Sequence, residues 1–154
     1  MEKIIKILRE KRKTISTMES CTGGGVANAI TNVENSSEVF RFGAVTYSNE
    51  FKIKMGVCED VIGKYSVYSM ETAEEMSKKI SEFTGSDYGI GVTGKLNTPD
   101  KNNEFSEDNV VYISIFDSTN DTFYNKKIFV DQKGRKENKN FVIDEIKSIL
   151  MEIL

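Results

Sequence analysis

The stretch MESCTGGGVANAIT, residues 18–31, decides the fold of this chain. An apolar run ends in Glu-Ser-Cys-Thr, three glycines follow, and the residues after them carry a helical pattern of apolar side chains. A strand that turns through glycines into a helix is typical of α/β proteins. The same junction brings together Ser20, Cys21 and Thr22, so it also raises the question of function.

Helices and strands are predicted along the whole chain. Apolar spacing and β-branched runs predict helices over residues 2–12, 23–33, 48–56, 59–65, 70–84 and 134–154, and strands over residues 14–18, 39–47, 87–94, 109–116 and 122–130. This order predicts a three-layer α/β/α sandwich with a mixed, mainly parallel five-stranded sheet. The strand over 87–94 is expected to be central, and the last two strands to pair antiparallel across a short polar turn. The helix over 70–84 is expected to bury Ala73, Met76, Ile80 and Phe83.

Composition limits the class of protein. A chain of 154 residues is expected to form one domain spanning residues 1–154. The net charge of -3 gives no reason to expect nucleic-acid binding. The charged, amphipathic start is unlike a signal peptide, and no apolar run is long enough to cross a membrane. We therefore expect a cytoplasmic protein without membrane contact.

The chain contains no histidine, and this excludes whole classes of mechanism. A Ser-His-Asp triad and a Cys-His pair are impossible. A conventional zinc site would need histidines or more cysteines than the two present, so no metal site is expected. Proton transfer would have to use Lys, Tyr, Asp, Glu or water.

The glycine turn after Ser20 allows three interpretations. It is a structural turn, an anion-binding nest, or the turn of a nucleophile, since glycines let the backbone approach a ligand closely. The spacing fits neither a Walker motif nor GxGxxG. Ser20 or Thr22 could also cap the following helix.

Two further clusters follow predicted strands. The first is YSNEFK, residues 47–52, in which Lys52 taken alone is typical of a solvated surface. Without histidine, however, a lysine is the most available base for a serine nucleophile, provided that desolvation lowers its pKa. The second is Val92-Thr93-Gly94, where Thr93 either presents a hydroxyl to the same site or only ends a strand.

Four segments resemble, in order and spacing, the CinA carboxy-terminal domain family, also called nicotinamide-nucleotide amidases: ESCTGG, SSEVFRFGAVTYSNEFKIKMGV, SMETAEEMS and GIGVTG. The resemblance covers about residues 2–153 and is to the stand-alone form. It implies an α/β/α fold and hydrolysis of nicotinamide mononucleotide to nicotinic acid mononucleotide and ammonia, in pyridine-nucleotide salvage. It also implies no metal or other cofactor, a pyridine mononucleotide as the small-molecule partner, and a homo-oligomer.

The resemblance also assigns roles to residues of this chain. Ser20 is expected to be the nucleophile and Lys52 its base, with Tyr47 and Thr93 as further catalytic residues. Backbone N–H groups of the glycine turn would stabilise the oxyanion. Substrate binding is expected to involve Cys21, Thr22, Gly23, Gly24, Asn49, Gly94 and Arg135, with Arg135 near the substrate phosphate.

The chain departs from the family pattern in two places. After VTG the family continues with a segment of the type IAGPGGG, whereas residues 95–108 read KLNTPDKNNEFSED and are expected to form a mobile loop. The small residues that the family has before the helix over 70–84 are also replaced here, by Tyr65, Ser66, Val67 and Tyr68. These departures motivate an alternative to the hydrolase, a weak or inactive member that serves as a nucleotide- or protein-binding module.

Overall fold

The computed structural model describes residues 1–97, 107–131 and 134–154. In these ranges the chain forms, in order, α1 (Glu2–Glu10), β1 (Ile15–Glu19), α2 (Gly25–Thr31), the 3₁₀ turn η1 (Ser36–Glu38), β2 (Phe40–Val45), α3 (Asn49–Lys54), α4 (Glu59–Tyr65), α5 (Met70–Thr84), β3 (Tyr88–Gly94), β4 (Val110–Asp117), β5 (Thr122–Phe129) and α6 (Arg135–Ile153). No helix in the described ranges is both long and apolar enough to cross a bilayer.

The strands form one mixed sheet in the order β2-β1-β3-β4-β5. β1 pairs parallel with β2 and β3, and β4 pairs antiparallel with β3 and β5. Four strands therefore run in one direction and β4 runs in the other, with β3 in the middle. The predicted sheet, its central strand and its final hairpin are confirmed.

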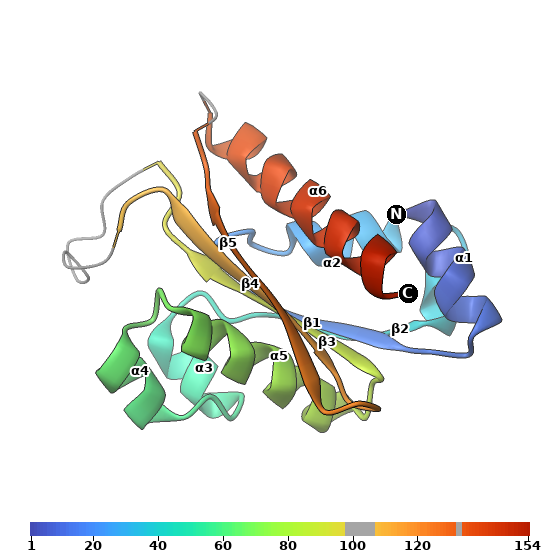
Figure 1. Cartoon of the computed structure of the whole chain (residues 1–154), viewed down its shortest axis with the longest axis horizontal. Coiled ribbons are helices and arrows are strands. Elements are labelled where there is room, and N and C mark those ends of the chain that lie inside the picture. The colour runs from blue at the N-terminus through green and yellow to red at the C-terminus, as the bar shows by residue number, and fades with distance from the viewer. Residues whose placement is uncertain (98–106, 132–133) are drawn as a thin grey trace.

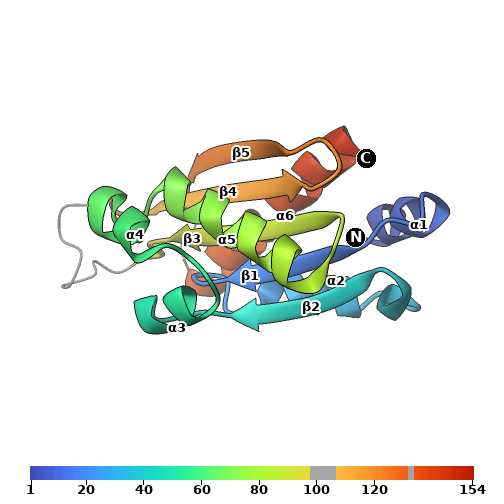
Figure 2. The same cartoon turned by 90° about the horizontal axis from the view of Figure 1, so that it is seen from below.

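Helices cover both faces of the sheet. Figure 1 shows α1, α2 and α6 on one face and α3, α4 and α5 on the other, and Figure 2 shows α5 lying along the middle strands. The larger apolar core lies between the sheet and α1, α2 and α6. A smaller cluster of Met18, Val57, Met76 and Ile80 lies under α5. The predicted three layers are confirmed.

Two glycines in β3 allow α5 to pack unusually close to the sheet. A Cβ on Gly89 would lie 2.0 Å from Ser77 O, and one on Gly91 would lie 2.2 Å from Ala73 O. Both distances are far below van der Waals contact, so any side chain at either position would force the helix outward. The backbone of β3 is therefore held directly against α5.

The expectation that Phe83 is buried is wrong. Phe83 is 66% exposed, and its ring lies 5.7 Å from that of Phe42 on the edge strand β2. The last turn of α5 lies at the margin of the sheet. Phe83 follows the helical spacing of the buried residues, but no further strand lies beneath it to cover its side chain. Ala73, Met76 and Ile80 are buried as expected.

Candidate active site

Ser20 lies directly after β1, at the edge where the parallel strands end. Side chains alternate along a strand, so Met18 and then Ser20 face α5, whereas Glu19 faces α2. The N–H of Ser20 donates to Val92 O over 3.0 Å and extends the pairing of β1 with β3 by one residue. This fixes the Ser20 hydroxyl at the carboxyl edge of the sheet, where ligands bind in open α/β sheets.

Helix α3 brings Lys52 to the same point. Its Nζ donates to Ser20 Oγ over 3.1 Å and to Thr46 O over 2.7 Å. Ser48 caps α3 by accepting a hydrogen bond from the N–H of Phe51, which gives this short helix a defined start. Lys52 is 1% exposed, so it is not the solvated surface residue that its sequence context alone would indicate.

The environment of Lys52 favours the neutral amine. Burial lowers the pKa of Lys52 from 10.5 to about 8, and the nearby Cys21 opposes this shift. No ion pair between described residues includes Lys52. With a pKa near 8, about a tenth of the side chain is neutral at pH 7, roughly 300-fold more than for an ordinary lysine. Lys52 can therefore accept a proton near neutral pH.

The glycines after Ser20 adopt conformations that favour glycine. Gly23 has a φ of 64° and Gly24 a φ of 90°, both in the left-handed region. The N–H of Gly23 donates to Ser20 O over 3.1 Å, and the N–H of Gly25 donates to Thr22 O over 3.3 Å. The chain thus reverses within a few residues and enters α2.

The carboxylate of Glu19 holds the start of α2, a role that the sequence analysis missed. Glu19 is fully buried and accepts hydrogen bonds from the N–H groups of Val26 and Ala27, over 3.0 and 2.8 Å, and from Thr22 Oγ1 over 2.7 Å. The expected capping of this helix by Ser20 or Thr22 is wrong, because the N-cap position is Gly24 and has no side chain. Glu19 satisfies the N–H groups that a cap would otherwise bind.

Two N–H groups of the turn are left over. Among the described residues, no hydrogen bond uses the backbone N–H of Thr22 or Gly24, and the N–H of Cys21 interacts only with its own thiol. These N–H groups belong to residues that follow Ser20 within the turn. They are the donors within the predicted turn that could bind an oxyanion formed by attack of Ser20.

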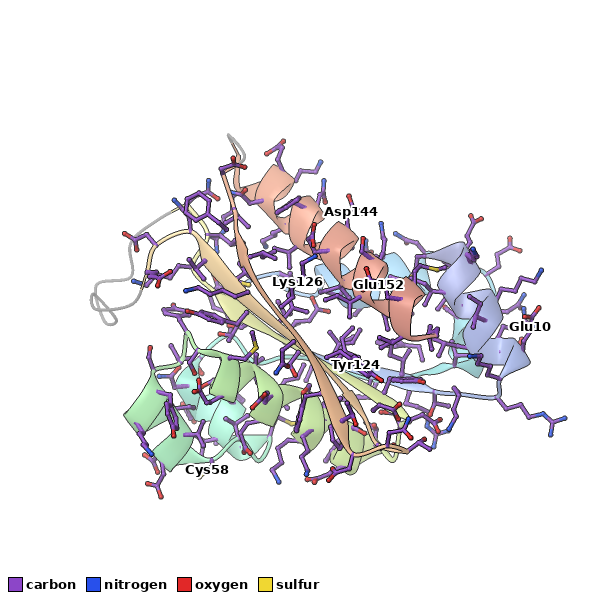
Figure 3. The ribbon with its side chains drawn as sticks, in the orientation of Figure 1. Glu10, Cys58, Tyr124, Lys126, Asp144 and Glu152 are labelled. Atoms are coloured by element: carbon purple, nitrogen blue, oxygen red, sulfur yellow. The ribbon has the colours of Figure 1, made fainter. Side chains whose placement is uncertain are left out.

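The two thiols of the chain differ in environment. Cys21 is 4% exposed, and burial raises its pKa to about 12, so it stays protonated near neutral pH. A protonated thiol is a poor nucleophile. Cys58 is exposed and lies in the α3–α4 layer, as Figure 3 shows. The geometry therefore favours Ser20 over Cys21 as the nucleophile.

Tyr47 and Arg135 form an outer rim. Arg135 donates from Nη2 to Tyr47 Oη over 3.2 Å and from Nη1 to Leu96 O over 2.5 Å. This joins the start of α6 to segments that follow β2 and β3. Tyr47 is 64% exposed, and within the described ranges no hydrogen bond joins it to the serine–lysine pair. Asn49, the first residue of α3, is also exposed.

Thr93 and Gly94 end the central strand beside Ser20. Thr93 is fully buried, and its hydroxyl donates to Val67 O over 2.9 Å. A Cβ on Gly94 would lie 2.4 Å from Val110 O, so the close passage of β4 requires glycine there. These contacts account for a threonine at position 93 and a glycine at position 94 without any contact with a substrate.

The two departures from the family pattern contact each other. Lys95 is 3% exposed, and its Nζ lies 5.6 Å from the ring of Tyr68 and 3.3 Å from Asp108 Oδ1. Leu96 is buried in the larger core. Residues 95–97 are thus anchored by their own side chains. The mobile loop expected over 95–108 otherwise falls on 98–106, outside the described residues.

Comparisons with known proteins concern the family and the fold. A family model described as "CinA C-terminal domain" matches residues 1–154. A CinA-like protein of Flavobacterium psychrophilum is 35% identical over 150 residues, which are 97% of this chain and 35% of that protein. A CinA-like protein of Kosmotoga olearia is 46% identical over 94 residues, 60% of this chain and 23% of that protein. The chain thus spans about a third or less of the length of these curated relatives.

Solved structures share the fold. The crystal structure of a competence-damaged protein (CinA) superfamily protein from Escherichia coli superposes with a TM-score of 0.89 at 22% sequence identity. The match covers 99% of this chain and 90% of that one.

Proposed function

Because this chain belongs to the CinA C-terminal domain family, we propose that it hydrolyses nicotinamide mononucleotide to nicotinic acid mononucleotide and ammonia. One observation carries the proposal. A buried lysine with a pKa lowered to about 8 lies with its Nζ 3.1 Å from Ser20 Oγ. A serine and a neutral lysine in hydrogen-bond contact supply a nucleophile and its base without histidine.

The first half of the reaction transfers the acyl group to the enzyme. Ser20 Oγ attacks the carboxamide carbon while the neutral amine of Lys52 takes the hydroxyl proton. The backbone N–H groups of the turn, above all those of Thr22 and Gly24, stabilise the oxyanion. As the tetrahedral intermediate collapses, the ammonium of Lys52 returns its proton to the leaving amine, and ammonia departs.

The rim supplies the recognition of the nucleotide. Arg135 is an exposed cation that contacts Tyr47, and a guanidinium binds phosphate oxygens in a bidentate manner. In this proposal Arg135 exchanges its contact with Tyr47 for the substrate phosphate. The released Tyr47 hydroxyl then faces the substrate.

The test is release of ammonia from nicotinamide mononucleotide. Ser20→Ala and Lys52→Ala should each lower kcat by roughly 10³-fold or more, because each removes one half of a catalytic pair. Lys54→Ala is the matched control, since Lys54 lies on the same helix and is exposed. An inactive wild type at high enzyme concentration, or a Ser20→Ala variant with full activity, would reject the mechanism.

A second function is favoured by the segment after Gly94. Lys95 and Leu96 are buried at the start of the segment that departs from the family's IAGPGGG pattern. The corresponding function is a binding module for a pyridine nucleotide without turnover. A rise in melting temperature with the mononucleotide, without ammonia release, would support it. Efficient turnover would exclude it.

A further inference from the structure

Thr46 carries a buried hydroxyl without a partner. Thr46 is 2% exposed, and its Oγ1 makes no hydrogen bond with any described residue. Buried hydroxyls are nearly always paired, because leaving one unpaired costs free energy. Oγ1 of Thr46 is closed to solvent in the free protein. Its unpaired state therefore points to a ligand or a reacting water that reaches it once substrate binding has opened the site.

The sheet places Thr46 beside the nucleophile. β1 and β2 are paired up to Glu19 and Val45, and the N–H of Thr46 donates to Glu19 O over 2.8 Å. The next pair in this parallel register is Ser20 with Thr46. Neighbouring strands lie about 4.8 Å apart, and side chains at one level share a face. The face is that of α5, since Ala44, two residues earlier, packs in the cluster under α5.

The same register continues across β3. Glu19 pairs with Val92, so Thr93 is the next residue opposite Ser20. The order of strands is β2-β1-β3, and three hydroxyls therefore form one row at the carboxyl edge, with Ser20 between two threonines.

The three hydroxyls differ in what they bind. Thr93 donates to Val67 O, so its proton is used within the protein. Ser20 accepts from Lys52 Nζ. Lys52 donates to the carbonyl of Thr46, whereas the hydroxyl of Thr46 makes no hydrogen bond with any described residue.

We propose that Thr46 Oγ1 binds the water molecule that hydrolyses the acyl group on Ser20. The inference rests on the proposed function and concerns its second half. Lys52, neutral again after ammonia has left, takes one proton of the water, and Thr46 accepts a hydrogen bond from the other. The water oxygen bonds to the acyl carbon, the bond from that carbon to Ser20 Oγ breaks, and Lys52 returns the proton to Ser20. The carboxylic acid product then ionises into solvent.

Thr46→Val tests this role, because valine keeps the shape and removes the hydroxyl. Acylation, which sets kcat/KM, should be unchanged, and deacylation should become rate-limiting. We expect kcat and KM for nicotinamide mononucleotide to fall together by roughly 10- to 100-fold, as for a misplaced reacting group. The acyl-enzyme should then accumulate on Ser20 and be visible by intact-protein mass spectrometry.

Two variants serve as controls. Thr46→Ser keeps the hydroxyl and should restore turnover. Thr31→Val removes an exposed hydroxyl on α2 and should behave as wild type. The melting temperature of Thr46→Val should not fall, since the lost hydroxyl has no partner, and this separates the role from a folding defect.

A second acyl donor separates this inference from the substrate assignment. p-Nitrophenyl acetate acylates reactive serines without needing nucleotide recognition, and its acetyl-enzyme should also persist longer in Thr46→Val. If only the ester acylates Ser20, the assignment of nicotinamide mononucleotide as substrate is wrong. The role of Thr46 is then decided by the rate at which the acetyl-enzyme is hydrolysed. A fall in kcat/KM with raised KM would instead assign Thr46 to substrate binding and overturn the proposal. Equal deacylation in wild type and variant, or no acylation of wild type by either reagent, would also overturn it.

Discussion

Replacing Lys52 by methionine should stabilise the folded protein at neutral pH. The side chain is almost fully buried, and a pKa lowered from 10.5 to about 8 measures how strongly the fold disfavours its charge. At pH 7 this corresponds to about 3 kcal/mol of lost stability. Methionine of similar length removes the charge but leaves Ser20 Oγ and Thr46 O without their donor, at about 1 kcal/mol each. We expect a net gain of about 1 kcal/mol at pH 7.

The pH dependence has a definite sign. The folded lysine loses its proton near pH 8 and the unfolded one near pH 10.5, so between these values the unfolded state binds more protons. Wild-type stability therefore rises with pH across this window relative to a variant without the amine. The cost of burying the charge falls from about 3 kcal/mol at pH 7 to about 1 kcal/mol at pH 9.5.

Urea unfolding of wild type and Lys52→Met at pH 7 and pH 9.5 measures both quantities. The difference in free energy of unfolding should move by about 2 kcal/mol in favour of wild type at the higher pH. Lys3→Met, at an exposed position on α1, is the control and should show no such movement. A difference between wild type and Lys52→Met that stays constant over this range would refute the lowered pKa.

Three further outcomes are expected. The kcat/KM for ammonia release should rise with pH, reach half its maximum near pH 8 and level off above it, because only the neutral amine can accept the serine proton; a flat profile from pH 6 to 9 would contradict this. Gly91→Ala should cost about 3 kcal/mol in urea unfolding, since its Cβ would lie 2.2 Å from Ala73 O. Gly63→Ala, with no atom within 4 Å of its Cβ, should not destabilise α4. Iodoacetamide at pH 7.5 should modify the exposed Cys58 and spare the buried Cys21, and peptide mass spectrometry showing equal rates would refute this assignment.

Local patterns were sufficient for the arrangement of elements. The run before Glu19, the glycines and the helical spacing after them correspond to β1, the turn and α2. The short polar segment before Thr122 produces the predicted hairpin of β4 and β5. Such features can be predicted from the sequence, because strand alternation, helical periodicity and turns depend on residues that are close together in the chain. Phe83 was assigned wrongly because periodicity gives the face of a helix but not where the sheet beneath it ends.

The residues that support the candidate site were harder to find. Glu19 was predicted only as part of the junction after the strand, although its carboxylate binds N–H groups seven and eight residues later. These reach the carboxylate only because Gly23 and Gly24 reverse the chain. Thr46 gave no signal at all, since its position beside Ser20 depends on the register between two strands.

By itself, the sequence determined that this chain is an α/β protein of the CinA C-terminal domain family and that any base near Ser20 could not be histidine. Only the tertiary structure decided that Lys52 is buried against Ser20 with a lowered pKa, and that Thr46 joins them with an unpaired hydroxyl. The reason is physical. Local conformation follows from adjacent residues, whereas desolvation and hydrogen bonding depend on segments that meet only when the sheet and α3 have packed.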